Sequence, residues 1–116
     1  MKIVIEGAGE VGSHLARILS REANEISIID IDQKRLDNLS ADTDVITVQG
    51  TPSSIKVLKK AGVPDADLFI AVNPSVPQDV NIVSAILAKK LGAKKASVRL
   101  ENEEYLGHTV NFRYYK

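Results

Sequence analysis

The chain has 116 residues, and its bulk properties already exclude several classes of function. It is 44% hydrophobic and 26% charged, which is typical of one globular domain that folds without a disulfide or metal staple. It contains no cysteine, so disulfides, thiolate metal sites and a cysteine nucleophile are excluded. The formal net charge is zero, so the overall charge gives no reason to expect nucleic acid or an anionic membrane as a partner.

Targeting signals are also missing from the sequence. No apolar run approaches the roughly 20 residues that a membrane-spanning helix needs. The opening segment, residues 1–6, is too short and too soon interrupted for a signal peptide. We therefore expect a cytoplasmic location and no direct membrane insertion. Short basic clusters, which we interpret as solvated faces, occur at Lys59-Lys60, Lys89-Lys90 and Lys94-Lys95.

The hydrophobic pattern alternates along the chain between that of a buried strand and that of a helix. Short apolar runs predict five strands, at residues 3–5, 26–29, 45–48, 68–72 and 96–100. Apolar side chains at helical spacing predict four helices between them, at residues 11–23, 33–39, 53–61 and 77–91. Asp32 is predicted to cap the second helix, Thr51-Pro52 to open the third, and Gly62 to end it.

This alternation determines the expected fold class. Strands that alternate with helices of this length predict parallel pairing with right-handed crossovers. We therefore expect α/β architecture: a doubly wound parallel sheet of the Rossmann type, in a single three-layer domain. Residues 1–106 are assigned to this lobe. For the tail, residues 107–116, which carries three of the five aromatic side chains, an edge strand, an interface arm and a ragged end all stay open.

A G-x-G-x-x-G pattern follows the first predicted strand and opens the first predicted helix. Gly7 allows a sharp turn, Gly9 lets a phosphate approach the backbone, and Gly12 lets the helix pack closely on the strand. Glu10 and Val11 complete the loop, and the helix N-terminus directs its free N–H groups at an anion. Because the pattern lies inside a β-α-β unit, it predicts a nucleotide-binding loop.

A carboxylate, Asp30, ends the second predicted strand 18 residues after Gly12 and is followed by Ile31. At this position a carboxylate accepts hydrogen bonds from the ribose hydroxyls of an adenosine, and it repels a 2′-phosphate. The position therefore favours NAD(H) or ATP/ADP over NADP. The alternative is that Asp30 only caps the next helix, although Asp32 is better placed for that role.

Three further residues follow other predicted strands at the same edge of the sheet. The first and fourth strands are expected to be neighbours, and ligands bind where the direction of winding reverses. Asn73, in the loop of residues 73–79, is the side chain expected to reach a ligand, with a simple turn role left open. Gly50 and Thr51 are expected to line the adenine side.

Two acidic residues near the glycine loop, Glu6 and Glu10, oppose tight phosphate binding. Either they point to solvent, or a cation such as Mg²⁺ offsets them, or the affinity is modest; Glu10 would in any case favour the helix dipole. His14 is expected to be a helix-surface residue. With no histidine pair and no Ser-His-Asp arrangement, we predict no enzyme, and we assign no catalytic and no metal-binding residue.

These residues resemble the N-terminal lobe of Trk-type potassium-uptake regulators, the regulator of potassium conductance domains. The likeness spans about residues 1–106. It is carried by Ile5-Glu6-Gly7-Ala8-Gly9-Glu10-Val11-Gly12, Leu15-Ala16, Ile29-Asp30-Ile31-Asp32, Val48-Gln49-Gly50, Leu58-Lys59-Lys60-Ala61-Gly62-Val63, Ala66-Asp67-Leu68-Phe69-Ile70-Ala71-Val72, Asn81 and Val98-Arg99-Leu100.

The resemblance implies a cytoplasmic subunit, peripheral to the inner face of the membrane, that binds NAD(H) or ATP/ADP and gates a membrane potassium transporter. It implies that Arg99 approaches the nucleotide phosphates, with a surface ion pair as the alternative. A homo-oligomer, dimer or tetramer, is expected. The apolar helix 77–91 and the aromatic tail are candidate interfaces, although burial within the fold explains the helix equally well.

This chain also departs from the family pattern. Thr51 stands where the family often has an acidic residue, and the loop before Asn81 is longer and richer in proline. The family's lobe continues through another helix and strand, so this chain is either a fragment or a short relative.

Two other functions stay open at this point. One is the cofactor domain of an NAD-dependent oxidoreductase, which the lack of an acid-base group in the crevice disfavours. The other is a Rossmann module that only oligomerises, which Glu6 and Glu10 keep open.

Overall fold

A computed structural model describes residues 1–99 of the chain and contains one five-stranded sheet. Every pairing is parallel, and the strand order is β3-β2-β1-β4-β5. This confirms the predicted doubly wound sheet, while the predicted tail, residues 107–116, lies outside the described residues. The strands are β1 (Lys2–Glu6), β2 (Glu25–Asp30), β3 (Ile46–Gln49), β4 (Leu68–Ala71) and β5 (Lys95–Val98).

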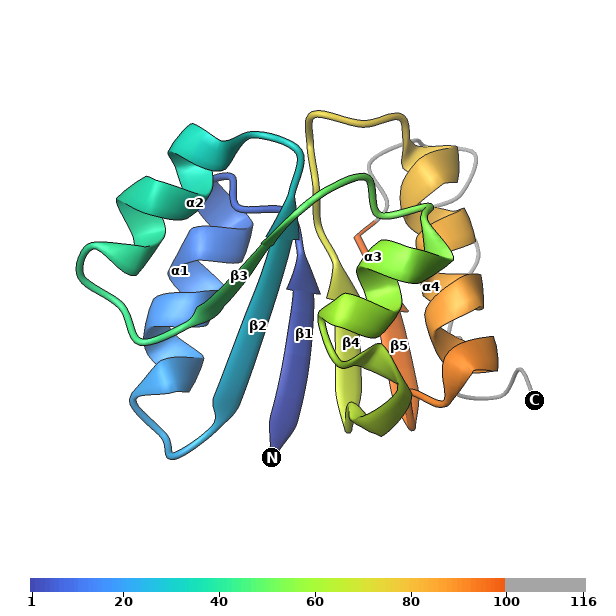
Figure 1. The fold of residues 1–116 in the computed structure, drawn as a ribbon, viewed down its shortest axis with the longest axis horizontal. Helices are drawn as coiled ribbons and strands as arrows, with labels where there is room; N and C mark the ends of the chain where they lie inside the picture. The colour runs from blue at the N-terminus through green and yellow to red at the C-terminus, as the bar shows by residue number, and fades with distance from the viewer. Residues whose placement is uncertain (100–116) are drawn as a thin grey trace.

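Helices cover both faces of the sheet, which gives the three layers visible in Figure 1. Each face of the sheet carries one apolar cluster. Along β1, Ile3 and Ile5 belong to the first cluster and Val4 belongs to the second, because successive side chains of a strand point to opposite faces. The first cluster is covered by α1 and α2, the second by α3 and α4. The helices are α1 (Glu10–Ser20), α2 (Gln33–Ser40), α3 (Ile55–Lys60) and α4 (Gln78–Leu91), with a short 3₁₀ turn at Val63–Asp65.

The reversal of winding lies between β1 and β4. Register pairs Glu6 of β1 with Ile29 of β2 and with Ala71 of β4, so the three strands end at the same level. Because α1 and α4 leave this edge on opposite faces of the sheet, the loops that precede them border one crevice. This confirms the expectation that the first and fourth strands are neighbours.

Two helix boundaries differ from the prediction. Thr51-Pro52 does not open α3; Ser54 does, because its hydroxyl accepts the N–H of Val57 at 3.3 Å and so fills the N-cap role. The first helix ends at Ser20 rather than near Ala23, which adopts a positive φ of 58°. Asp32 caps α2 as predicted, accepting from the N–H of Lys34.

Helix α4 is apolar on much of its surface because the fold buries much of it. Its buried face, formed by Asn81, Ser84, Ala85 and Ala88, is flanked by Ile82, Ile86, Leu87 and Leu91, which pack on the core. Val83 remains 46% exposed. Packing within the domain therefore accounts for most of the apolar character that also suggested an interface. Among residues 1–99, no helix is long and apolar enough to cross a membrane.

Candidate functional site

The glycine loop connects β1 to α1 through close backbone contacts. Gly7 has a φ of +116°, and a Cβ there would lie 2.6 Å from Cα of Asn73. A Cβ on Gly12 would lie 1.7 Å from the carbonyl oxygen of Gly7. Gly9 is the N-cap of α1 and has no side chain to cap it, so the first N–H groups of the helix are left available to an anion. The loop therefore has the geometry of a phosphate cradle.

Asp30, the last residue of β2, holds the glycine loop against the end of that strand. Its side chain is fully buried, and its Oδ2 accepts the backbone N–H of Ala8 at 2.8 Å. Its Oδ1 accepts the N–H of Asp32, also at 2.8 Å. Asp32, not Asp30, provides the side-chain cap of α2. The carboxylate thus sits between the glycine loop and the start of α2, where the sequence predicted a ribose-binding group.

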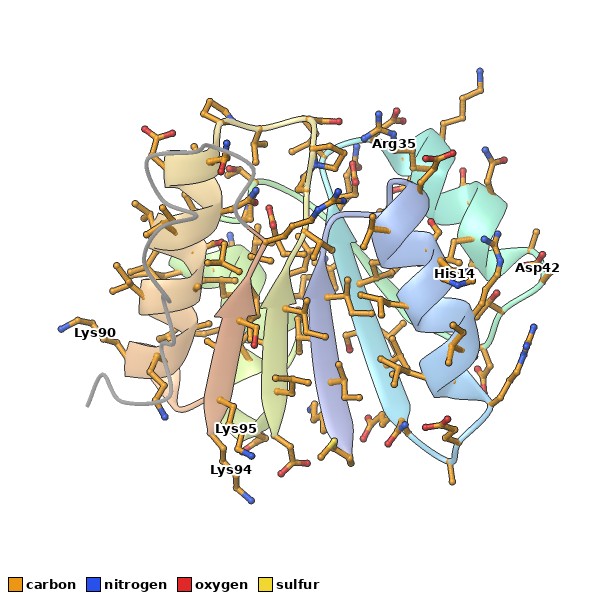
Figure 2. All side chains as sticks on the ribbon, turned by 180° about the vertical axis from the view of Figure 1, so that it is seen from behind. His14, Arg35, Asp42, Lys90, Lys94 and Lys95 are labelled. Atoms are coloured by element: carbon orange, nitrogen blue, oxygen red, sulfur yellow. The ribbon has the colours of Figure 1, made fainter. Side chains whose placement is uncertain are left out.

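Arg35, on α2, belongs to this site and was not predicted from the sequence. Its guanidinium lies 3.9 Å from Oδ2 of Asp30 and 3.8 Å from Oδ2 of Asp32. It also donates to the hydroxyl of Ser75, in the loop between β4 and α4. Figure 2 shows Arg35 near the carboxyl ends of the strands. The available signal was its spacing of three residues from Asp32, which places both on one helical face.

Asn73 lies on the β4 side of the crevice. Its side chain is buried, with Oδ1 accepting the N–H of Ser75 at 2.9 Å and its carbonyl accepting the amide of Asn81. These contacts give it the turn role that the sequence had left open. Its Nδ2 has no well-formed hydrogen bond within the described residues, so one donor remains for a ligand or a neighbouring acceptor.

Glu6 ends β1 and is fully buried. Neither of its carboxyl oxygens makes a well-formed hydrogen bond within residues 1–99. The pKa of Glu6 is raised to about 7 because burial disfavours the charged form; the side chain and backbone of Asn73 oppose the rise, and the charge of Asp30 adds to it. The solvent-facing alternative is therefore wrong for Glu6, whereas Glu10 is exposed at the first position of α1.

Four other residues were predicted to contribute to the site: Gly50, Thr51, Ile31 and Val11. The N–H of Gly50 donates to the carbonyl of Asp30 at 3.0 Å, which places its loop beside the end of β2. Thr51 is exposed, and Ile31 is 47% exposed. Val11 packs its side chain against the apolar cluster under α1, so only its backbone faces the loop.

Arg99 follows β5 and is joined to β4 through its N–H, which donates to the carbonyl of Ala71 at 3.0 Å. Its exposed side chain and Asn73 both line a pocket of about 230 Å³ under the loop between β4 and α4. A larger and more open groove, of about 700 Å³, lies between α1 and α2 beside the glycine loop. His14 lines this groove and is exposed, as expected of a helix-surface residue.

The fold thus brings Gly7, Gly9, Asp30 and Asn73 together at the carboxyl ends of β1, β2 and β4, with Gly50 beside β2 and Arg99 after β5. A Cβ on Gly9 would touch only the ring of Pro74, at 3.2 and 3.3 Å, so the glycine loop and the loop after β4 face each other closely. Within residues 1–99, no group of three or more His, Cys, Asp or Glu side chains is arranged to hold a metal ion.

Comparison with known proteins identifies the family. A family model described as the TrkA-N domain matches residues 3–111, nearly the whole chain. The chain belongs to the TrkA-N family. This confirms the resemblance found in the sequence.

Two curated TrkA-N relatives illustrate the extent of the match. The chain is 44% identical over 110 residues to the Trk system potassium uptake protein TrkA homolog of Archaeoglobus fulgidus, covering 95% of this chain and 24% of that protein. It is 42% identical over 107 residues to Trk system potassium uptake protein TrkA of Haemophilus influenzae, covering 91% of this chain and 23% of that protein. The chain therefore spans about a quarter of the length of these relatives.

Two solved structures share the fold. The Kef CTD of Shewanella denitrificans, in an AMP-bound form, has a TM-score of 0.72 and 21% identity, covering 90% of this chain and 62% of that one. The TrkA-N domain of the inner membrane protein ybaL from Escherichia coli has a TM-score of 0.61 and 17% identity, covering 91% of each chain. At these identities the likeness establishes the fold alone.

Proposed function

We propose that this TrkA-N lobe is a non-catalytic sensor that binds an adenosine nucleotide, NAD(H) or ATP/ADP, and thereby regulates a membrane potassium transporter. The ligand would lie in the crevice between the glycine loop and the loop after β4. The relatives' names, which describe potassium uptake proteins, support the transporter part. The geometry around β1 and β2 supports the nucleotide part.

The position of Asp30 is the observation that carries the proposal. Each carboxylate oxygen accepts one backbone N–H and keeps lone-pair capacity for a ribose hydroxyl. The carboxylate is already held in place, so binding costs little side-chain entropy. A 2′-phosphate here would meet both Asp30 and Asp32, which disfavours NADP.

The phosphates would lie at the N-terminus of α1, over Gly9 and the backbone of Glu10 and Val11. The helix terminus supplies N–H donors and a partial positive charge, and no Cβ stands at Gly9. The ring of Pro74 lies close to Gly9, so a phosphate would displace the loop after β4 outwards. In this proposal Arg99 supplies the compensating positive charge from the β5 side, where it shares a pocket with Asn73.

The adenine base would lie on the opposite side, between the ends of β2 and β3. Gly50 and Thr51 would offer backbone groups to its edge, and Ile31, which is 47% exposed, would offer an apolar surface to its face. This arrangement gives the base contacts from two loops of one half of the sheet, while the phosphates extend towards the other half.

Regulation would follow from the ligand's preference for one arrangement of the lobes over another. In the proposal the lobe is cytoplasmic, assembles as a homo-oligomer and acts on the inner face of the membrane through the transporter. Because this chain spans about a quarter of its relatives' length, these features concern an assembly larger than the lobe itself.

Calorimetric titration of the chain with AMP, ADP, ATP, NAD⁺, NADH and NADPH tests the nucleotide part. We expect saturable binding of at least one ligand with an unmodified ribose and no measurable binding of NADPH. The variant Asp30→Asn should bind that ligand about 100-fold more weakly, since it loses charge-assisted hydrogen bonds to both ribose hydroxyls.

Two outcomes would contradict the proposal. The first is no binding of any of the six nucleotides to a folded chain. The second is binding that Asp30→Asn leaves unchanged, because the nucleotide would then occupy a different site. The matched control Asp37→Asn changes an exposed carboxylate on α2 and should not alter affinity by more than about twofold.

A further inference from the structure

A buried acidic group, Glu6, immediately precedes the glycine loop in the chain. Glu6 is the last residue of β1, and the next residue, Gly7, begins the glycine loop. The main chain of Glu6 is fixed, because its carbonyl accepts the N–H of Val72 at 2.9 Å. Its side chain points to the same face of the sheet as Val4, two residues earlier, and thus towards the apolar layer under α3 and α4.

On balance, the surroundings of this side chain disfavour a negative charge, because the effect of burial exceeds that of Asn73. Glu6 is fully buried, and neither carboxyl oxygen makes a well-formed hydrogen bond within the described residues. The Asn73 amide is the polar group that acts most on it, yet Nδ2 of Asn73 is also without a well-formed hydrogen bond. A buried ionised carboxyl without hydrogen bonds is costly, whereas the protonated form is neutral and tolerates this environment.

Charged groups on the packed elements add to this preference. Asp30, on the neighbouring β2, is the charged side chain that acts on Glu6, and it opposes ionisation. Residues 68–77, on the β4 side, contain no charged side chain, and α4 contributes the neutral Asn81 and Ser84 to the buried face. Other charged groups near this edge are outside the buried layer: Glu10, Asp32, Asp79, Arg35 and Arg99.

We propose that the crevice binds its phosphate-bearing ligand together with one proton, which the buried carboxyl group of Glu6 holds. This inference rests on the proposed nucleotide site, and the proton is a second ion that the site takes up with the nucleotide. A phosphate at the α1 N-terminus adds negative charge close to a carboxyl that is already poorly solvated. Ligand and proton therefore favour each other, and the ionised form of Glu6 disfavours the ligand.

The size of the coupling follows from Coulomb's law. Two unit charges about 10 Å apart at an effective dielectric constant of about 20 shift a pKa by about one unit. Since the pKa of free Glu6 is about 7, bound ligand would raise it by about that amount. Affinity should then fall about tenfold between pH 6 and pH 9, and net proton uptake should peak near half a proton between pH 7 and 8.

Proton uptake can be measured directly. NAD⁺ and ADP are titrated into the full chain without Mg²⁺ at pH 6, 7, 8 and 9, each in two buffers of different ionisation enthalpy. The difference in observed heat gives the number of protons bound. In Glu6→Gln, whose neutral amide mimics the protonated acid, uptake through this residue should vanish, and affinity at pH 9 should stay near its value at pH 6. Comparing the two chains removes the titration of the ligand's own phosphate.

Two controls make the result specific to Glu6. Glu25→Gln makes the same chemical change at an exposed glutamate at the start of β2 and should behave as the unmodified chain. The ¹³C resonance of the Glu6 carboxyl, followed against pH with and without ligand, needs no variant. It should show the upward shift of the pKa even if Glu6→Gln fails to fold.

The outcomes separate this inference from the function on which it rests. If nucleotide binds but uptake and pH dependence are equal in the unmodified chain and Glu6→Gln, or if protons are released, the inference is wrong and the function stands. If Mg²⁺ abolishes the uptake and restores tight binding at pH 9, a divalent cation and not a proton offsets Glu6. If neither NAD⁺ nor ADP nor any other nucleotide binds at any pH, the proposed function fails and this inference fails with it.

Discussion

The ends of β1 and β2 lie side by side, and each carries a fully buried acidic side chain, but the fold treats the two differently. At the end of β2, Asp30 accepts two backbone N–H groups and has the Arg35 guanidinium 3.9 Å away. At the end of β1, Glu6 has no well-formed hydrogen bond within residues 1–99. The first carboxyl is hydrogen-bonded and has a cation beside it; the second is held where its charge is unfavourable.

Burial alone therefore does not determine whether the charge of an acidic side chain is compensated. Strand alternation turns Asp30 towards the face of α1 and α2, where two chain segments begin and leave N–H groups unpaired. It turns Glu6 towards the opposite face, where neither carboxyl oxygen makes a well-formed hydrogen bond within residues 1–99. Which face a side chain meets thus determines whether its charge is compensated.

Substitutions in the glycine loop, which lies between Glu6 and Asp30, should have the largest effect on the free energy of unfolding. Gly12→Ala would place a Cβ 1.7 Å from the Gly7 carbonyl oxygen, so we expect a loss of at least about 4 kcal/mol of unfolding free energy. Gly9→Ala meets only the ring of Pro74 and should cost less than about 1 kcal/mol, while weakening nucleotide binding at least about tenfold. Urea unfolding measures the stability of the two variants, and calorimetric titration measures their affinity for the nucleotide. Equal stability of Gly12→Ala and Gly9→Ala would contradict the close packing of Gly12 on Gly7.

At the β2 end, Asp30→Asn should cost about 3 kcal/mol of stability, since one of the two N–H donors of Ala8 and Asp32 would then face an amide donor. Asp32→Asn should change stability by less than about 0.5 kcal/mol, because asparagine caps a helix as well as aspartate. Denaturant unfolding of the pair tests this. A loss as small in Asp30→Asn as in Asp32→Asn would show that Asp30 does not hold the loop.

At the β1 end, we expect the opposite result: removing the charge of Glu6 should stabilise the chain at high pH. The pKa of Glu6 in the folded chain, about 7, lies above its ordinary value of 4.5. Between these values the folded chain holds a proton that the unfolded chain has released, so stability falls as the pH rises from about 4.5 to about 7. The full loss, complete above about pH 8, is about 3 kcal/mol relative to pH 4. Glu6→Gln should lack this loss and be the more stable chain at pH 8.5. Parallel pH profiles for the two chains would contradict the account.

The contact across the crevice should have the smallest effect. Arg35 is half-buried and Ser75 is exposed, so their coupling energy should not exceed about 1 kcal/mol. A double-mutant cycle of Arg35→Gln and Ser75→Ala, followed by urea unfolding, measures it. A coupling of several kcal/mol would mean that the contact holds the two halves of the sheet together and not merely closes the crevice.

The sequence predicted the doubly wound sheet and the position of Asp30 at the end of β2 because both rest on local patterns. Periodicity identifies a buried strand, and the spacing of glycines and an acidic residue within a β-α-β unit fixes where those residues meet. Arg35 and the burial of Glu6 depend on which face each side chain meets and on segments about 40 to 70 residues away, Ser75 and Asn73. The cap of α3 was misassigned because Thr51, Ser53 and Ser54 offer equivalent hydroxyls, and only the path of the chain after Gly50 selects among them.

A crystal structure of the chain grown with the nucleotide that binds in the titrations would show whether an adenosine nucleotide occupies this crevice through Asp30. We expect both ribose hydroxyls within hydrogen-bond distance of the Asp30 carboxylate and the phosphates at the N-terminus of α1. A nucleotide found instead in the groove between α1 and α2, beside His14, with no contact to Asp30, would contradict it.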